Sequence, residues 1–240
     1  MIRVVLYQGR PSGRIPPAHL ARIRAASPDF LCLPEYFWVP AGTLAHGDAA
    51  AFAPHAHAAL AALSRDLDCV IVGGSYVTAQ DGVLYNTCPV YDRGRLAGEQ
   101  QKVNPTPAER AAGVAAGKAF GAIAAGGRRL GVLICADVLL AGSFAQMRAL
   151  GVDLVFAPTL SPYLPFDTPA DKEARDRDIF CAGAIAAAAP VFKACGVGRI
   201  FGGHRLQGRS LAASATGTLL ARVPFDREQR AAVIVVEVEA

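Results

Sequence analysis

The sequence predicts an α/β fold with a mixed β-sheet, and three observations lead to this class. Short apolar runs of strand length recur along the whole chain. Alanine-rich segments of helical length separate several of these runs, and strands that alternate with helices are typical of α/β proteins. Between residues 70 and 101 the strands instead follow one another with only turns between them, so antiparallel pairing is expected to join the parallel part.

The expected strands are short runs of apolar residues. The first lies near the N-terminus, where an apolar run ends at Gln8 and Gly9, and the last is rich in valine. In chain order, the expected strands span residues 3–7, 30–33, 69–72, 84–91, 130–134, 154–157, 210–213 and 232–238. The tripeptides Gln80-Asp81-Gly82 and Asp92-Arg93-Gly94 predict the turns of the antiparallel part.

The expected helices combine alanine with other helix-forming residues. They span residues 17–26, 50–65, 143–150 and 169–188. The last of them begins with Thr168-Pro169-Ala170-Asp171, in which the threonine and the aspartate form a capping box and the proline takes the first helical position. This helix therefore has the most clearly marked start.

The composition favours a single domain over residues 1–240. Of the 240 residues, 52% are hydrophobic and 18% are charged, which is enough to bury a substantial core, and no linker-like stretch interrupts the chain. The longest uncharged apolar stretch, residues 181–192, ends at Lys193 and is too short to span a membrane. The N-terminal run is of strand length and lacks the features of a signal peptide, so we expect a cytoplasmic protein.

Charge and potential ligands argue against several function classes. The net charge is +4, but the arginines are spread along the chain without a basic block, so we expect no nucleic-acid partner. His55 and His57 are two residues apart and would point away from each other on a helix, and no acidic or thiol cluster completes a ligand set. We therefore expect no metal. The six cysteines lack C-x-x-C spacing and lie mostly in apolar runs, which predicts reduced thiols.

Three reactive residues lie at or just beyond strand-like sequence. Cys135 follows the apolar run 130–134, Glu35 follows Leu33 and Pro34, and Lys102 follows the last strand of the antiparallel part. Lysine is scarce in this chain and arginine is common, so a lysine at this position suggests that ammonium chemistry is required. A carboxylate could take the proton of the thiol, and the ammonium could stabilise a developing oxyanion.

Each of these residues also has a purely structural interpretation. Glu35 could be a solvated loop carboxylate, Lys102 a surface charge that pairs with Glu99, and Cys135 a residue of the core. His204 offers a rival mechanism in which an imidazole, in place of Glu35, is the base for the thiol. The residues taken one at a time leave these alternatives open.

Taken together and in this order, three segments resemble the nitrilase or carbon-nitrogen hydrolase superfamily, which has a Glu-Lys-Cys triad. The segments are Phe30-Leu31-Cys32-Leu33-Pro34-Glu35-Tyr36, Gln101-Lys102-Val103-Asn104-Pro105 and Val132-Leu133-Ile134-Cys135-Ala136-Asp137. Tyr85-Asn86-Thr87, Gly151-Val152-Asp153-Leu154 and Gly208-Arg209-Ser210 are similar to further family motifs. The resemblance implies a four-layer α-β-β-α sandwich, a homodimer or higher homo-oligomer, and a small-molecule amide as substrate without metal or organic cofactor.

The resemblance also implies roles for single residues. Cys135 attacks the amide carbon, Glu35 shuttles the proton, and Lys102 with the backbone N–H of Ala136 stabilises the oxyanion before water hydrolyses the thioester. Nitrile hydrolysis and acyl transfer by the same triad are alternatives. An alternative of another class is a non-catalytic module that binds a small molecule or assembles with other copies.

Two positions near the triad need separate interpretation. Glu109 lies in a segment similar to one of the nitrilase branch, which implies a site residue that helps to hold the lysine and the substrate, yet Thr106 and Glu109 also form a capping box. The glutamate could therefore be a site residue, a helix cap or both. Ala136 takes the place after the nucleophile where relatives usually have tyrosine or tryptophan, so the pocket is expected to differ in shape there. The aromatic residues 36–38 could line that pocket or pack a loop.

Overall fold

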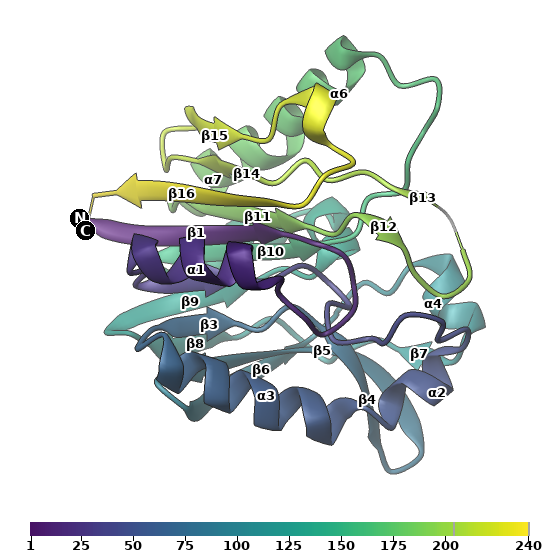
Figure 1. Cartoon of the computed structure of the whole chain (residues 1–240). Coiled ribbons are helices and arrows are strands. Elements are labelled where there is room, and N and C mark those ends of the chain that lie inside the picture. Colours follow the sequence, from purple (N-terminus) through teal and green to yellow (C-terminus); the bar gives the residue numbers. More distant parts are fainter. Residues whose placement is uncertain (204, 240) are drawn as a thin grey trace.

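The computed structural model describes residues 1–203 and 205–239, and it consists of two β-sheets that lie face to face between two layers of helices (Figure 1). The strand order of the first sheet is β16-β1-β2-β3-β5-β4, and β6 and β7 also pair with β5. The order of the second sheet is β15-β14-β11-β10-β9-β8. The α/β class and the four-layer α-β-β-α arrangement are confirmed.

Both sheets have a parallel centre with antiparallel strands at their edges. The first sheet contains β1 (Ile2–Gln8), β2 (Phe30–Cys32), β3 (Val70–Val72), β4 (Tyr76–Gln80), β5 (Val83–Asp92), β6 (Arg95–Gln101), β7 (Val114–Ala115) and β16 (Ala232–Val238). The second contains β8 (Ala122–Ala125), β9 (Arg128–Val132), β10 (Leu154–Thr159), β11 (Val191–Cys195), β14 (Leu211–Ala213) and β15 (Leu219–Arg222). A separate ribbon is made of β12 (Gly198–Arg199) and β13 (Arg205–Leu206).

Helices cover the outer face of each sheet. The helices of the described residues are α1 (Pro17–Ala26), α2 (His46–Ala50), α3 (Ala53–Asp66), α4 (Pro107–Ala111), α5 (Ser143–Ala149), α6 (Pro169–Arg175) and α7 (Ala182–Ala187). Short 3-10 helices η1 (Cys135–Leu139) and η3 (Phe225–Arg227) and a π-helical segment η2 (Asp176–Cys181) complete the set. Helices α1 and α3 pack on the first sheet, whereas α5, η2 and α7 pack on the second.

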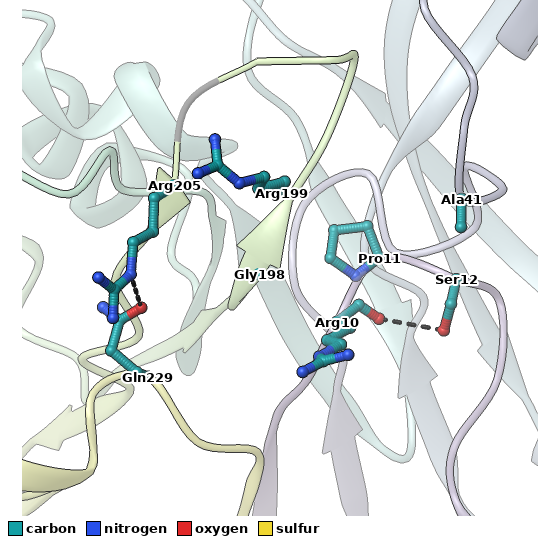
Figure 2. Close-up of a pocket in the computed structure, with 8 residues that line it drawn as sticks. All are labelled: Arg10, Pro11, Ser12, Ala41, Gly198, Arg199, Arg205 and Gln229. Atoms are coloured by element: carbon teal, nitrogen blue, oxygen red, sulfur yellow. Dashed lines mark hydrogen bonds between the residues drawn. The ribbon is translucent and has the colours of Figure 1, made fainter.

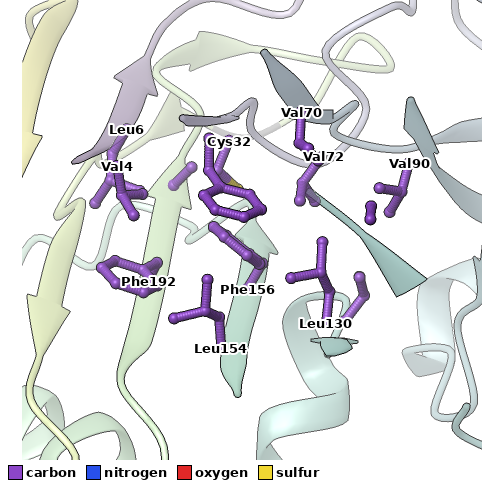
Figure 3. Close-up of a cluster of buried hydrophobic side chains, with 14 of the residues drawn as sticks. Val4, Leu6, Cys32, Val70, Val72, Val90, Leu130, Leu154, Phe156 and Phe192 are labelled. Atoms are coloured by element: carbon purple, nitrogen blue, oxygen red, sulfur yellow. The ribbon is translucent and has the colours of Figure 1, made fainter. Parts of the chain in front are cut away.

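The core between the sheets follows from the two-residue period of the strands. Val4 and Leu6 of β1 face the second sheet, where they meet the cluster that contains Phe156 and Phe192 (Figure 3). These two rings stack with their centroids 5.3 Å apart. The intervening Val5 points the other way, into the cluster under α1 and α3. Such alternation fixes which side chains of a strand enter the core between the sheets and which lie under the helices.

Most predicted elements are present, with a few boundary corrections. The helix expected over residues 50–65 begins only at Ala53, because Pro54 starts a new helix there and residues 46–50 form the separate helix α2. The strand expected over residues 130–134 ends at Val132, because the chain turns before Cys135. Both predicted turns are two-residue loops with positive φ, at Asp81-Gly82 and at Arg93-Gly94.

Several strands have no counterpart among the predicted ones. The most important of these is β11. Its residues continue the alanine-rich run for which the sequence predicts a helix up to residue 188. The short strands β7, β8, β12, β13 and β15 were also not predicted. None of the helices in residues 1–203 and 205–239 combines the length and the apolar character that crossing a bilayer requires.

Candidate active site

Cys135 lies in a sharp turn just beyond β9. It starts the 3-10 helix η1 with φ at 49°, in the left-handed region that non-glycine residues rarely adopt. The residue is partly exposed, and its side chain lines a pocket of about 360 Å³, here named the thiol pocket. The strained turn therefore presents the thiol at the carboxyl end of the second sheet.

The buried carboxylate of Asp137 holds this turn in place. One oxygen accepts the N–H of Ile134 at 2.9 Å, and the other accepts the N–H of Asn104 at 2.7 Å. The side chain of Asn104 in turn donates to the carbonyl of Ala136 at 2.9 Å. Burial raises the pKa of Asp137 to about 6, although these N–H donors oppose the rise. The segment that follows Lys102 is thereby joined to the turn that carries the thiol.

Glu35 comes from the loop after β2 and is almost fully buried in the thiol pocket. Its Oε1 accepts hydrogen bonds from Lys102 at 2.8 Å and from Asn86 at 2.9 Å, and its Oε2 accepts the N–H of Leu160 at 3.1 Å. Burial raises the pKa of the Glu35 carboxyl, and the charge of Glu109 adds to the rise while Lys102 opposes it.

Lys102 directly follows β6 and lies between two carboxylates. Its Nζ is 2.8 Å from Glu35 Oε1 and 2.7 Å from Glu109 Oε2, and the side chain is only 1% exposed. Burial disfavours the charged form, but Glu35, Cys135 and Glu109 together raise the pKa of Lys102 above its ordinary value. The ammonium is therefore charged throughout the physiological range.

Glu109 lines the thiol pocket and takes part in a helix cap at the same time. Its Oε2 accepts both the ammonium of Lys102 and the backbone N–H of Thr106, at 2.7 Å each, and Thr106 caps helix α4. Its Oε1 accepts from the hydroxyl of Tyr36 at 2.6 Å and from Asn86 at 2.8 Å. Burial alone would raise the pKa of Glu109, but Lys102 and the hydrogen bonds from Lys102, Tyr36 and Thr106 lower it to about 2.

The peptide group of Leu160 connects the thiol to Glu35. Its N–H donates to Glu35, and its carbonyl accepts the thiol proton of Cys135 with sulfur and oxygen 3.3 Å apart. Burial and the negative charge of Glu35 raise the pKa of the Cys135 thiol well above that of a free thiol. The thiol is thus neutral at rest, and a base is needed to activate it.

Apolar and aromatic side chains form the walls of the thiol pocket. Tyr36, His46 and Phe201 pack against one another there, with the rings of His46 and Phe201 stacked 4.0 Å apart. Of the three aromatic residues after Glu35, only Tyr36 lines this pocket, whereas Phe37 and Trp38 pack in the core under α1 and α3. Tyr36 therefore fits the interpretation that this segment lines the pocket, whereas Phe37 and Trp38 fit the interpretation that it packs against the protein.

A larger hollow of about 750 Å³ lies elsewhere on the molecule (Figure 2). It is lined by Arg10, Arg199 and Arg205, and Arg205 donates to Gln229 at 2.7 Å. This hollow shares no lining residue with the thiol pocket, and none of the sequence-predicted site residues lines it. Size alone does not identify the site.

The structure brings the predicted residues together and adds others. Glu35, Lys102, Glu109 and Cys135 all line the thiol pocket. The N–H of Ala136 belongs to the first turn of η1, where N–H groups lack an acceptor within the helix. His204 lies outside the residues that the structure describes. The site residues that sequence reasoning did not single out are Asn86, Asn104, Asp137 and Leu160.

Solved structures of other proteins have a similar fold. Comparison with curated proteins gave no match. The amidase from Nesterenkonia sp. AN1 has a similar structure, in a mutant with the acetamide moiety of fluoroacetamide added covalently at its active-site cysteine. Its TM-score is 0.80 at 21% identity, over 99% of this chain and 90% of the other.

A carbon-nitrogen hydrolase from Helicobacter pylori G27 is also similar, with a TM-score of 0.81 at 18% identity over 98% of this chain and 89% of the other. At these identities the likeness concerns the fold. The sequence itself matches the family described as carbon-nitrogen hydrolase over residues 19–240, which is most of the chain. The chain therefore belongs to the carbon-nitrogen hydrolase family.

Proposed function

We propose that this enzyme hydrolyses the amide of a small molecule through a thioester on Cys135. The observation that carries the proposal is the position of the Leu160 peptide group, which binds the thiol through its carbonyl and the Glu35 carboxylate through its N–H. Thiol and base thus line one pocket and are bound to the same peptide group. Because the resting thiol is neutral, a base at this position is what the chemistry requires.

In the first half of the reaction, Glu35 takes the thiol proton while the sulfur of Cys135 forms a bond to the amide carbon. The carbonyl oxygen becomes an oxyanion, which the ammonium of Lys102 and the N–H of Ala136 stabilise. The tetrahedral intermediate then collapses. The C–N bond breaks, the leaving nitrogen takes the proton from Glu35, and ammonia or an amine departs.

In the second half, water replaces the departed amine. Glu35 takes a proton from this water as the oxygen attacks the thioester carbon, and the same two donors stabilise the second oxyanion. Collapse breaks the C–S bond, releases the acid and returns the proton to the sulfur. The raised pKa of Glu35 supports its role as the base, because a carboxylate whose pKa lies above its ordinary value takes a proton from the thiol or from water more readily.

The test is ammonia release from a panel of amides by the wild-type enzyme and by Cys135→Ala. Turnover should fall by at least about a thousandfold in the variant, because the covalent route is lost. Cys69→Ala is the matched control, since it removes a buried thiol that lies outside the thiol pocket. A Cys135→Ala enzyme with wild-type turnover would refute the proposal. Hydroxamate formation with added hydroxylamine would show whether an amine competes with water for the thioester.

A further inference from the structure

A second pocket of about 260 Å³ adjoins the thiol pocket and is named here the side pocket. Both pockets are lined by Cys135 and Leu160, so they meet at the thiol. The side pocket extends from there over Ala136 to the helix-covered face of the second sheet, where Lys193 of β11 and Arg209 line it. A group bound to the sulfur can therefore enter either pocket.

The two pockets differ in charge. The thiol pocket contains two carboxylates and one ammonium, those of Glu35, Glu109 and Lys102. Among the described residues that line the side pocket there are three cations, Arg175, Lys193 and Arg209, and no carboxylate. Arg175 is paired with Asp167 at 2.6 Å. The remaining excess of positive charge therefore comes from Lys193 and Arg209.

These two buried cations share one carboxylate, which accepts a long hydrogen bond from Arg209 and makes none with Lys193. Asp176 Oδ1 is 3.4 Å from Arg209 Nε and 3.8 Å from Lys193 Nζ, and the three side chains are each 4% exposed or less. The same carboxylate also attracts Arg222 at 3.8 Å. Burying a charge without a close partner is costly. Two buried cations with one carboxylate between them leave one positive charge without a counter-charge.

Several buried hydrogen-bonding atoms of this region lack a partner within the described residues, and Asp176 Oδ2 is one of them. Arg209 Nη1 is buried and has no hydrogen-bond partner within the described residues. Gln207, another residue of the side pocket, has its Oε1 in the same condition, and rotation of that amide would present its N–H₂ group instead. Buried donors without acceptors are uncommon in folded proteins. A ligand with acceptor oxygens would satisfy them.

The backbone beside the side pocket is also unusual. Asp176, Ile179 and Phe180 belong to η2, the π-helical segment between α6 and α7. Such wide turns often occur at functional sites. Here Phe180 lies under the ammonium of Lys193, with Nζ 4.5 Å from the ring centroid, which holds the cation in place without neutralising it.

From these contacts we propose that the side pocket binds a carboxylate of the substrate, so that the enzyme acts on amides that also carry a negative charge. This inference rests on the proposed function, because it assigns the substrate class of the same thiol. Arg209 donates to the carboxylate through the unused Nη1, and Lys193 contributes its charge. The bound substrate then has its amide carbon at Cys135 and its carboxylate in the side pocket.

The first experiment compares glutaramate with the neutral amide in which an isopropyl group replaces the carboxylate. For the wild-type enzyme, kcat/KM should be higher for glutaramate by about tenfold or more. Arg209→Gln should lower that ratio by about tenfold, whereas Asp176→Asn should raise it, because it removes the carboxylate that competes for the two cations. Asp176→Asn also keeps the test valid if Arg209→Gln does not fold.

Lys172→Met is the matched control for loss of a buried cation. Lys172 pairs with Glu228 at 2.7 Å and lines neither pocket, so this variant should leave the ratio of the two substrates unchanged. A merely structural role of Arg209 would lower the rates for both substrates together and leave their ratio as it is. That result, or equal rates for the two substrates in the wild-type enzyme, would overturn the inference.

A binding measurement separates this inference from the proposed function. Glutarate should protect Cys135 from alkylation by iodoacetamide, as followed by mass spectrometry, and Arg209→Gln should require about ten times more glutarate. If no amide is hydrolysed but glutarate protects, the proposed function fails and the carboxylate site stands. If the neutral amide is hydrolysed and glutarate gives no protection, the proposed function stands and the carboxylate site is refuted.

Discussion

Lys102 and Glu109 form a buried ion pair, with Nζ and Oε2 2.7 Å apart, and the same carboxylate oxygen accepts the N–H of Thr106 at the start of α4. The ammonium is thus fixed by an element of secondary structure as well as by Glu35. A buried lysine has many rotamers to lose, so a rigid partner reduces the cost of holding it where an oxyanion would form. The carboxylate of Glu109 thus completes the helix cap and also pairs with the ammonium.

The first prediction is that Glu109→Gln lowers kcat by about tenfold to a hundredfold, which corresponds to roughly 1.4 to 3 kcal/mol of transition-state free energy. Glutamine can still cap the helix, because the capping box accepts either residue. It cannot pair with the ammonium, so Lys102 moves toward Glu35 alone. Steady-state kinetics on an amide substrate would show the lost activity, and urea unfolding would show separately how much stability the charge of Glu109 contributes.

The matched control for that variant is Asp171→Asn. Asp171 accepts the N–H of Thr168 at 2.9 Å in the capping box of α6, but it is exposed and lines neither pocket. This substitution makes the same change of charge in the same local motif, and it should leave kcat unaltered. Equal kinetic effects of the two substitutions would mean that Glu109 acts only as a cap.

The second prediction concerns the acid limb of the pH–rate profile. Glu35 must be ionised to take the thiol proton, and its pKa is raised from 4.5, so kcat/KM should fall as the pH decreases toward a midpoint above 4.5. In Glu109→Gln this midpoint should move to lower pH, because the negative charge of Glu109 contributes to the raised pKa. A midpoint that moves upward would contradict the assignment of Glu35 as the base.

The third prediction follows from the lowered pKa of Glu109. This group has a pKa near 4.5 in the unfolded chain and about 2 in the folded protein, so the unfolded state binds more protons between these values. Its contribution to stability is complete above pH 4.5 and is lost as the pH falls toward 2. The difference in unfolding free energy between the wild-type protein and Glu109→Gln, measured with urea, should therefore shrink over this range.

The fourth prediction tests the support of the thiol. Asp137→Asn replaces one of two acceptor oxygens by an N–H₂ group, so either Ile134 or Asn104 loses the acceptor for its buried N–H. The cost in unfolding free energy should be about 1 to 3 kcal/mol, and kcat should fall because the turn at Cys135 relaxes. Asp153→Asn, which alters an exposed bond to the N–H of Arg129, should have little effect on either quantity.

The sequence pointed to the charged residues and the thiol that the structure gathers in the thiol pocket, but not to the groups that hold them there. Glu35 follows β2 of the first sheet and Cys135 follows β9 of the second, each after two intervening residues, and both line the thiol pocket. Leu160 acts through its backbone, so its side chain gives no signal. The contact of Asn86 with both carboxylates depends on the register of β5 against its neighbours, which a single sequence does not specify.

The error over β11 has an informative cause. The run from residue 181 to residue 192 is apolar throughout, and periodicity alone does not separate a buried helix from a buried strand in such a run. In the sequence, Lys193 marks the end of this uncharged run. In the structure it lies in the middle of β11 and is 1% exposed. A charged residue within an apolar strand is a signal for a buried polar site, which periodicity does not register.

The last prediction concerns Ala136, the residue that follows Cys135. Its side chain lines the side pocket but not the thiol pocket. Ala136→Tyr keeps the backbone N–H and fills the side pocket, so kcat/KM for hexanamide should fall by about tenfold relative to that for acetamide, which needs only the thiol pocket. Ala145→Tyr, at an exposed position of α5 outside both pockets, should leave this ratio unchanged. An unchanged ratio in Ala136→Tyr would show that acyl chains do not enter the side pocket.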